Sequence, residues 1–172
     1  ISVNDFLIRA VTKALKKYPN FNASFKGDYL QLNPSVNMGI AVAIEQGLIV
    51  PTINNCQDKS LAEIAKVTRD VISRTQNGTL RAEEHTGSTF SISNLGMFEI
   101  DSFSAIILPP NVAVLAVGKV MERPVVQKGL ISVAQTMEAT LSVDHRVADG
   151  AEAARFMGEL KSQLESAATL LL

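Results

Sequence analysis

Cysteine and histidine are scarce, and this scarcity limits the kinds of site that the chain can build. The sequence has one cysteine and two histidines. Cys56 has no partner for an internal disulfide, which excludes a disulfide scaffold, and no histidine or glycine-rich turn flanks it. We therefore expect Cys56 to be a small, partly buried residue rather than a reactive thiol. Without paired Cys/His spacing there is no zinc motif, so we expect no bound metal.

Charge and long apolar runs are also in short supply. Charged residues make up 19% of the 172 residues and the formal net charge is −1, which gives no electrostatic reason to expect a nucleic-acid partner. No apolar run approaches the ~18 residues of a transmembrane helix, so no membrane partner is expected. Apolar residues still make up 47% of the chain, enough for one domain with its own core. The shortage of charge predicts that part of the surface is covered in an assembly.

Motifs for three common chemistries are absent. The chain has no G-x-S-x-G nucleophile elbow, no G-x-G-x-x-G turn and no P-loop. These absences argue against an ordinary α/β-hydrolase and against dinucleotide or nucleotide chemistry.

Hydrophobic periodicity predicts helices interspersed with short strands, and hence an α/β fold with a mixed sheet. Capping patterns at Ser2, Ser60 and Asp149 mark three helix starts. The expected helices are 3–18, 61–76 and 150–165, with a short helical turn at 81–85. The expected strands are 23–26, 29–32, 36–44, 48–50, 89–94, 104–108, 112–119, 131–135 and 136–144. Pro51 should weaken further strand pairing after 48–50.

One polar stretch lies where a strand should end and a helix begin. Residues 144–150 read Asp-His-Arg-Val-Ala-Asp-Gly, and sheet proteins often place their chemistry at such strand ends. His145 is the candidate reactive group, although a structural histidine at a strand end fits the pattern equally. Asp149 is explained by helix capping alone. His85 lies in a polar connection and is expected to be a solvated loop residue.

The residues 144–151, Asp-His-Arg-Val-Ala-Asp-Gly-Ala, resemble the D-H-R-x-x-D-G-A signature of the dihydrolipoamide acyltransferase catalytic domain. More loosely, they are similar to the H-x-x-x-D-G of chloramphenicol acetyltransferase and the H-H-x-x-x-D-G of peptide-synthetase condensation domains. Three earlier segments, 22–24, 47–51 and 89–96, also match the family and stand in the family's order. The resemblance covers residues 1–172. It implies the two-layer sandwich with a mixed sheet of the coenzyme A-dependent, chloramphenicol acetyltransferase-like acyltransferases.

Residues 94–98 and 103–110 look like the pyruvate dehydrogenase branch of this family, which implies an enzyme that transfers an acetyl group between a dihydrolipoyl arm and coenzyme A. His145 would be the general base, Ser93 would stabilise the oxyanion and Asp149 would hold the loop around His145. The family match also places Phe103, Ile106 and Leu115 along the pantetheine passage, with ordinary core or interface packing as the alternative. The lipoyl group would come from another domain.

The resemblance also implies an assembly, with an active site between two subunits of a trimer and trimers built into cubic or dodecahedral cores. Further partners would be lipoyl domains, and the decarboxylase and dihydrolipoamide dehydrogenase components through domains outside this chain. The location would be the mitochondrial matrix or the bacterial cytoplasm. Residue 1 is Ile rather than Met, so we expect a fragment or a processed chain. The resemblance implies that residues 1–172 are a catalytic domain without its first helix and strands, and without lipoyl and subunit-binding domains.

Two positions depart from the family pattern: Ser88 and Glu99 stand where glycine is frequent. The alternatives that stay open are a non-catalytic structural core component and a branched-chain or succinyl specificity. A small-molecule acetyltransferase is disfavoured by the Asp-His-Arg form of the motif. Intact His145, Ser93 and Asp149 favour the catalytic interpretation.

Overall fold

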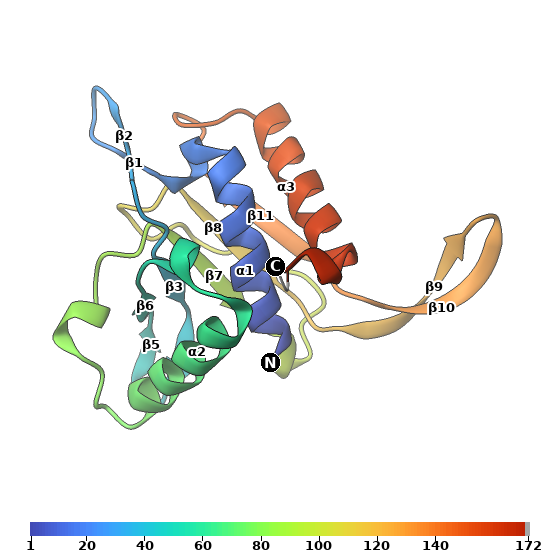
Figure 1. The fold of residues 1–172 in the computed structure, drawn as a ribbon, viewed down its shortest axis with the longest axis horizontal. Coiled ribbons are helices and arrows are strands. Elements are labelled where there is room, and N and C mark those ends of the chain that lie inside the picture. The colour runs from blue at the N-terminus through green and yellow to red at the C-terminus, as the bar shows by residue number, and fades with distance from the viewer. Residues whose placement is uncertain (171–172) are drawn as a thin grey trace.

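The computed structural model describes residues 1–170, and within them three α-helices begin where the capping residues predict (Figure 1). These helices are α1 (Val3–Lys17), α2 (Leu61–Gln76) and α3 (Gly150–Glu165). The side chains of Ser2, Ser60 and Asp149 each accept a hydrogen bond from the backbone N–H three residues further on. Such a cap is typically worth about 1 kcal/mol, so these starts are fixed by local chemistry.

A mixed sheet of five strands forms the layer behind the helices. Its order is β11 (Ala139–Val143), β8 (Ala113–Val117), β7 (Phe90–Asn94), β3 (Met38–Ile40) and β6 (Thr52–Ile53). The three central strands β8, β7 and β3 are parallel, and the two edge strands are antiparallel to their neighbours. The sheet and the helix layer confirm the predicted α/β class with a mixed sheet.

The core lies between the helix layer and the sheet. All five residues of β8 are buried, and the inward face of α1 packs against the same cluster. Phe156 of α3 joins the layers, because its ring centroid lies 4.8 Å from that of Phe21 and 6.0 Å from that of Phe90. The loop that precedes α3 is therefore anchored by well-packed elements on both sides.

Three two-stranded hairpins form separate small sheets beside the five-stranded one. They are β1 (Ala23–Phe25) with β2 (Leu30–Leu32), β4 (Val42–Ile44) with β5 (Gly47–Ile49), and β9 (Met121–Gln127) with β10 (Leu130–Thr136). The β9–β10 hairpin is the longest and extends away from the body as an arm (Figure 1). Its turn, Lys128-Gly129, has positive φ at both residues, as a two-residue hairpin turn requires.

The observed strands differ from the sequence predictions in four details. The expected strand 104–108 is irregular, and its Ala105 carbonyl accepts a hydrogen bond from the Ser142 hydroxyl instead of a ladder partner. The expected strand 36–44 breaks at Ala41 into β3 and β4. Strand β6 pairs with β3 directly after Pro51, because the Pro51 carbonyl still accepts a bond from Ile40. Strand β9 was not predicted, since Glu-Arg-Pro at 122–124 has low strand propensity.

Candidate active site

The stretch 144–150 forms a tight loop between β11 and α3. The Asp144 N–H donates to the Val112 carbonyl at 2.8 Å, and the Asp144 carbonyl accepts from Val147 at 2.9 Å and from Ala148 at 3.3 Å. Val147 and Ala148 are buried, while His145 is exposed. The hydrogen bonds and the buried residues fix the loop, while the imidazole of His145 faces solvent and can be reached by a ligand.

Asp149 caps α3 from the end of the same loop. Its Oδ1 accepts a hydrogen bond from the Glu152 N–H at 2.7 Å. This backbone bond is the main reason that the pKa of Asp149 is lowered, and the charge of Arg155 acts in the same direction. Asp149 is therefore a carboxylate at neutral pH that fixes the junction between the loop and the helix, as predicted for its capping role.

A clamp around His145 was missed by the sequence reasoning. The Arg146 guanidinium donates to both carboxylate oxygens of Asp144, at 3.0 Å from Nε and 2.6 Å from Nη2. These bonds lower the pKa of Asp144. The same guanidinium stacks on the Phe25 ring, with its carbon 4.1 Å from the ring centroid. Only the Asp-x-Arg spacing around His145 could have signalled this clamp.

Ser93 lies in β7, half-buried, and far from His145 along the sheet. Ser93 is level with Ala116 of β8, and Ala116 is level with Thr140 of β11. His145 comes after Val143, the last residue of β11. At ~3.3 Å per residue, Thr140 and Val143 alone are about 10 Å apart along the strand. One chain therefore does not bring Ser93 and His145 together.

The three residues predicted along a ligand passage lie in different surroundings. Ile106 is 94% exposed, Phe103 is half-buried and Leu115 is 0% exposed. Phe103 and Ile106 belong to the irregular segment that runs beside β11. The burial of Leu115 within β8 favours the alternative of core packing for this residue, while the other two offer apolar surface to a ligand or a second chain.

The segment that leads to Phe103 crosses the end of β8 at Gly118. A Cβ atom at Gly118 would lie 1.7 Å from the carbonyl oxygen of Asp101. The Lys119 N–H donates to the Ile100 carbonyl at 2.8 Å and holds the crossing. Glu99 at its start has φ of 60°, the left-handed region in which glycine is favoured.

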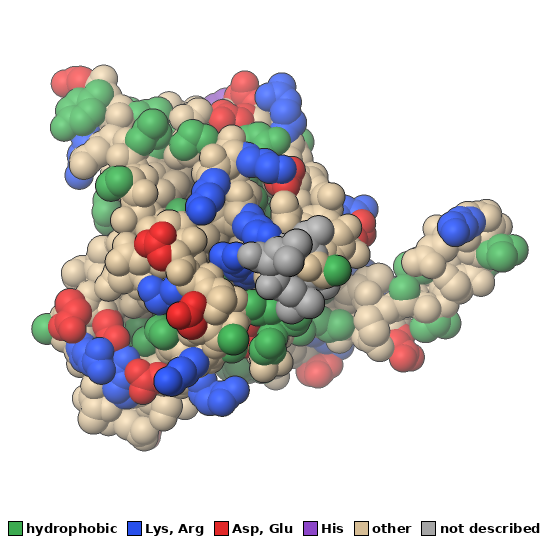
Figure 2. Space-filling model, in the orientation of Figure 1, with side chains coloured by type: hydrophobic (Ala, Val, Ile, Leu, Met, Phe, Trp, Pro, Cys, Tyr) green, Lys and Arg blue, Asp and Glu red, His purple; other side chains and the backbone are tan. Residues whose placement is uncertain are grey.

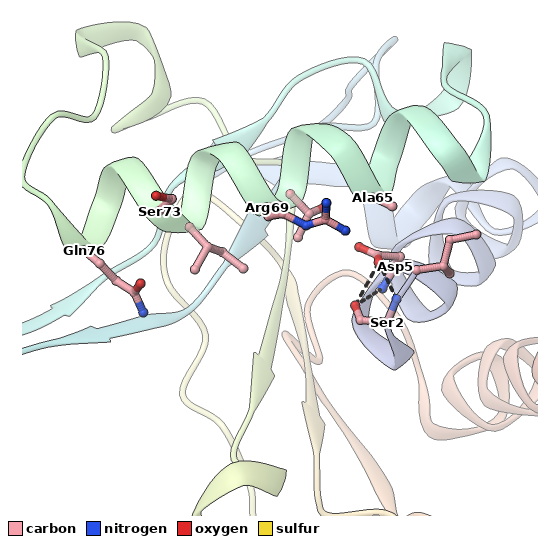
Figure 3. A pocket seen from close by; sticks show the side chains of 9 residues that line it. Ser2, Asp5, Ala65, Arg69, Ser73 and Gln76 are labelled. Carbon is pink, nitrogen blue, oxygen red and sulfur yellow. Dashed lines mark hydrogen bonds between the residues drawn. The ribbon is translucent and has the colours of Figure 1, made fainter.

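A cavity of about 380 Å³ lies elsewhere, between the start of α1 and α2 (Figure 3). Figure 3 shows Ser2 and Asp5 joined by hydrogen bonds beside it, with Arg69, Ser73 and Gln76 of α2 along its length. None of the predicted site residues lines this cavity.

The other residues that the sequence singled out lie away from the loop. Cys56 is fully buried rather than partly buried, and burial raises the pKa of its thiol to about 11, which favours the expected unreactive residue. His85 is exposed in its loop, as predicted. Among residues 1–170, no helix has the length and apolarity to cross a membrane. The same residues contain no group of three or more metal-ligating side chains.

Comparison with known proteins gives a consistent result over the whole chain. The family described as 2-oxoacid dehydrogenases acyltransferase (catalytic domain) matches residues 1–172. The chain is 46% identical over 176 residues to the dihydrolipoyllysine-residue acetyltransferase component of the mitochondrial pyruvate dehydrogenase complex of Schizosaccharomyces pombe, covering 100% of this chain and 36% of that protein. It is 42% identical over 172 residues to the Rickettsia felis component, covering 100% and 42%. The chain therefore spans less than half the length of these curated relatives.

Solved structures agree with these relatives. The Azotobacter vinelandii dihydrolipoamide acetyltransferase, studied for the roles of a serine, a histidine and an asparagine in its catalytic mechanism, superposes with a TM-score of 0.95 at 34% identity, covering 99% of this chain and 71% of that one. A cubic core of the pyruvate dehydrogenase multienzyme complex gives the same values. Chloramphenicol acetyltransferase, at 18% identity and a TM-score of 0.57 over 95% of this chain and 78% of that one, shares the fold. The predicted fold class is confirmed.

Proposed function

Since the chain belongs to the 2-oxoacid dehydrogenases acyltransferase family (catalytic domain), we propose that its protein transfers an acetyl group between a dihydrolipoyl arm and coenzyme A. The relatives at 46% and 42% identity are the acetyltransferase components of pyruvate dehydrogenase complexes. The observation that carries the proposal is the exposed His145 on an anchored loop at the sheet's end, within the signature 144–151.

The proposed catalytic residues are Ser93 and His145, with Asp149 as the residue that holds the loop. In the Azotobacter vinelandii enzyme the histidine follows the serine by 52 positions, and the asparagine follows the histidine by 4. Ser93, His145 and Asp149 have the same two spacings. An aspartate thus stands at the position of the asparagine, and here it caps α3.

The chemistry assigned to these residues is a direct transfer between two thiols. A thiol has a pKa of about 8.5, so little of it is ionised at neutral pH and a base is needed. His145 takes the proton from the attacking thiol, and the sulfur adds to the thioester carbonyl. The Ser93 hydroxyl donates a hydrogen bond to the resulting oxyanion. When the intermediate collapses, the departing thiolate takes the proton from the imidazolium, which restores the neutral base.

We assign this site to two copies of the chain, because one chain separates Ser93 from His145 along the sheet. A ring in which each subunit gives its serine end to one neighbour and its histidine end to the other builds identical sites. The proposed assembly is a trimer, with trimers joined into a cubic or dodecahedral core. Support comes from the superposition on a subunit of the cubic core.

The β9–β10 arm supports self-association. Its outward apolar side chains are 71–82% exposed at Val126, Ile131 and Val133, and hydrophobic atoms line the arm in the space-filling view (Figure 2). A two-stranded hairpin alone is marginally stable in water, so an arm of this length needs a surface to pack against. A second copy of the chain supplies that surface in the proposed trimer.

Coenzyme A and the dihydrolipoyl arm are substrates in this proposal, and the lipoyl group is supplied by a separate domain. Phe103 and Ile106 offer the apolar surface that a pantetheine chain requires. The proposed partners are lipoyl domains, the decarboxylase and dihydrolipoamide dehydrogenase, reached through domains outside this chain. Its proposed location is the mitochondrial matrix or the bacterial cytoplasm, as relatives include mitochondrial and bacterial proteins.

A panel of acyl donors tests the proposal. The full-length protein is mixed with free dihydrolipoamide and acetyl-, succinyl- or isobutyryl-coenzyme A, and the released coenzyme A is measured. We expect acetyl-coenzyme A to give the highest kcat/KM. Preference for a larger donor would replace the acetyl assignment, and no transfer from any donor would indicate a structural core component.

A further inference from the structure

The backbone around His145 is closed into a ring by its two neighbours. The Arg146 N–H donates to Asp144 Oδ1 at 3.0 Å, which makes residues 144–146 an Asx turn with His145 at its centre. In such a turn the backbone of the central residue is held from both sides. The direction in which the imidazole leaves the chain is therefore set by the bond between residues 144 and 146.

The Arg146 side chain closes the turn a second time. Its Nε and Nη2 donate to the carboxylate that already accepts the Arg146 N–H, at 3.0 and 2.6 Å. A planar guanidinium that engages both carboxylate oxygens fixes orientation as well as distance. The Asp144 carboxylate is mostly covered, at 19% exposure, although the guanidinium itself is 64% exposed. An exposed ion pair alone would contribute little to stability. To hold the turn in one orientation, the Arg146 side chain therefore needs a further contact with another element.

Phe25 supplies that anchor. Arg146 stacks on the Phe25 ring, and Phe25 is half-buried in β1. Strand β1 begins in the core, because Ala23 at its start and Phe21 just before it are fully buried. The contact ties the loop between β11 and α3 to a separate element, so the Asx turn cannot rotate without breaking the stack.

We propose that Arg146 is a positioning residue for the acetyl transfer: it joins Asp144 to Phe25 and so fixes the turn that aims His145 at the attacking thiol. This inference rests on the proposed function and deepens it. The Arg146 guanidinium is held by Asp144 and Phe25, so in this proposal its removal acts on the rate of the chemical step through the position of His145. Substrate binding, which depends on other surfaces, stays largely unchanged.

The test compares Arg146→Ala, Arg146→Lys and Phe25→Leu in the assembled full-length protein, with His145→Ala as the inactive reference. We expect Arg146→Ala to lower kcat by a factor on the order of ten to a hundred, because a small misplacement of a catalytic group has effects of this size. KM for both substrates should stay within about twofold. Arg146→Lys should restore only part of kcat, since an ammonium cannot bind both oxygens of the Asp144 carboxylate in a planar arrangement or stack on the Phe25 ring. Phe25→Leu should give a smaller loss.

Two controls separate the possible outcomes. Arg69→Ala, at an exposed position on α2, should leave kcat unchanged. Amide hydrogen exchange at residues 145–148 should speed up in Arg146→Ala, with the other helices and strands unaffected. A wild-type kcat in Arg146→Ala beside an inactive His145→Ala would overturn the inference and leave the proposed function standing. Lost assembly with an unchanged kcat per assembled subunit would also overturn it. Absence of acetyl transfer in the wild type would overturn the proposed function. Amide hydrogen exchange would then still show whether Arg146 holds the turn.

Discussion

Ser93 and His145 lie at opposite ends of the sheet within one chain, because Ser93 is level with Thr140 whereas His145 follows the far end of β11. If both residues serve one reaction, each site combines two chains. We therefore expect Ser93→Ala and His145→Ala to be nearly inactive alone and to complement each other when co-assembled. With equal mixing, about a quarter of the ring's sites regain both residues. Steady-state transfer after unfolding and co-refolding measures the recovery.

The size of each single loss provides the baseline for this experiment. Removing one oxyanion donor typically lowers kcat by about a hundredfold to a thousandfold, which is the loss expected for Ser93→Ala. A mixture of separately refolded variants is the matched control and should stay inactive. Full activity of either single variant, or no recovery in co-assembled particles of normal size, would argue against a shared site.

The crossing at Gly118 predicts a large loss of stability on a minimal substitution. A methyl group at this position would lie 1.7 Å from the carbonyl oxygen of Asp101, and the atoms that it meets belong to the backbone, which cannot move aside as a flexible side chain can. Gly118→Ala should therefore lower the free energy of unfolding by at least about 3 kcal/mol, the upper end for overpacked sites. Gly158→Ala in α3 is the matched control, because its Cβ meets nothing within 4 Å. Because alanine has a higher helix propensity than glycine, Gly158→Ala should raise the free energy of unfolding by about 1 kcal/mol. Urea unfolding measures the free energy of unfolding of both variants. Equal changes in Gly118→Ala and Gly158→Ala would contradict the close backbone contact at Gly118.

The exposed arm predicts that assembly can be weakened without unfolding the chain. Ile131 is 82% exposed and lies opposite Val126 on the apolar side of the hairpin. A lysine at such a position changes the stability of one chain by little, within about 0.5 kcal/mol. In a trimer the same charge would be buried without a partner. Ile131→Lys should shift the mass in light scattering to smaller species, while Gln127→Lys on the other side should not. An unchanged mass would show that the arm lies outside the interface.

The helices could be predicted from the sequence because their starts are local. Ser2, Ser60 and Asp149 each bond to the backbone three residues away, so the capping pattern and the structure report one interaction. Strands depend on partners that the local sequence does not contain. Residues 104–108 have the sequence pattern of a strand but form no ladder, and the Ala105 carbonyl accepts a hydrogen bond from the Ser142 hydroxyl instead. Strand β9 is the reverse case, since pairing with β10 overrides its poor propensity.

The candidate site shows the same division. The loop 144–150 and the capping role of Asp149 could be read from contiguous residues. The contact of Arg146 with Phe25 could not, because it joins segments that are far apart in the chain. Periodicity placed Leu115 on a strand without showing that both faces of β8 are covered. That covering excludes Leu115 from the surface of the single chain.

An ion pair between α2 and the turn 82–84 predicts a specific loss of stability in acid. Glu84 is 8% exposed, and Arg74 donates to its Oε1 at 2.7 Å. This bond lowers the pKa of Glu84 from its ordinary value of 4.5 to about 2. Because the pKa is depressed in the folded state, the stabilisation is present above pH 4.5 and is lost as the pH falls toward 2. The upper limit of this stabilisation is on the order of 3 kcal/mol.

Glu84→Gln should therefore flatten the fall in unfolding free energy across this pH window, while Glu83→Gln at the exposed neighbour keeps the wild-type slope. Equal slopes in all three proteins, measured by urea unfolding at each pH, would exclude this pair as the source of acid sensitivity.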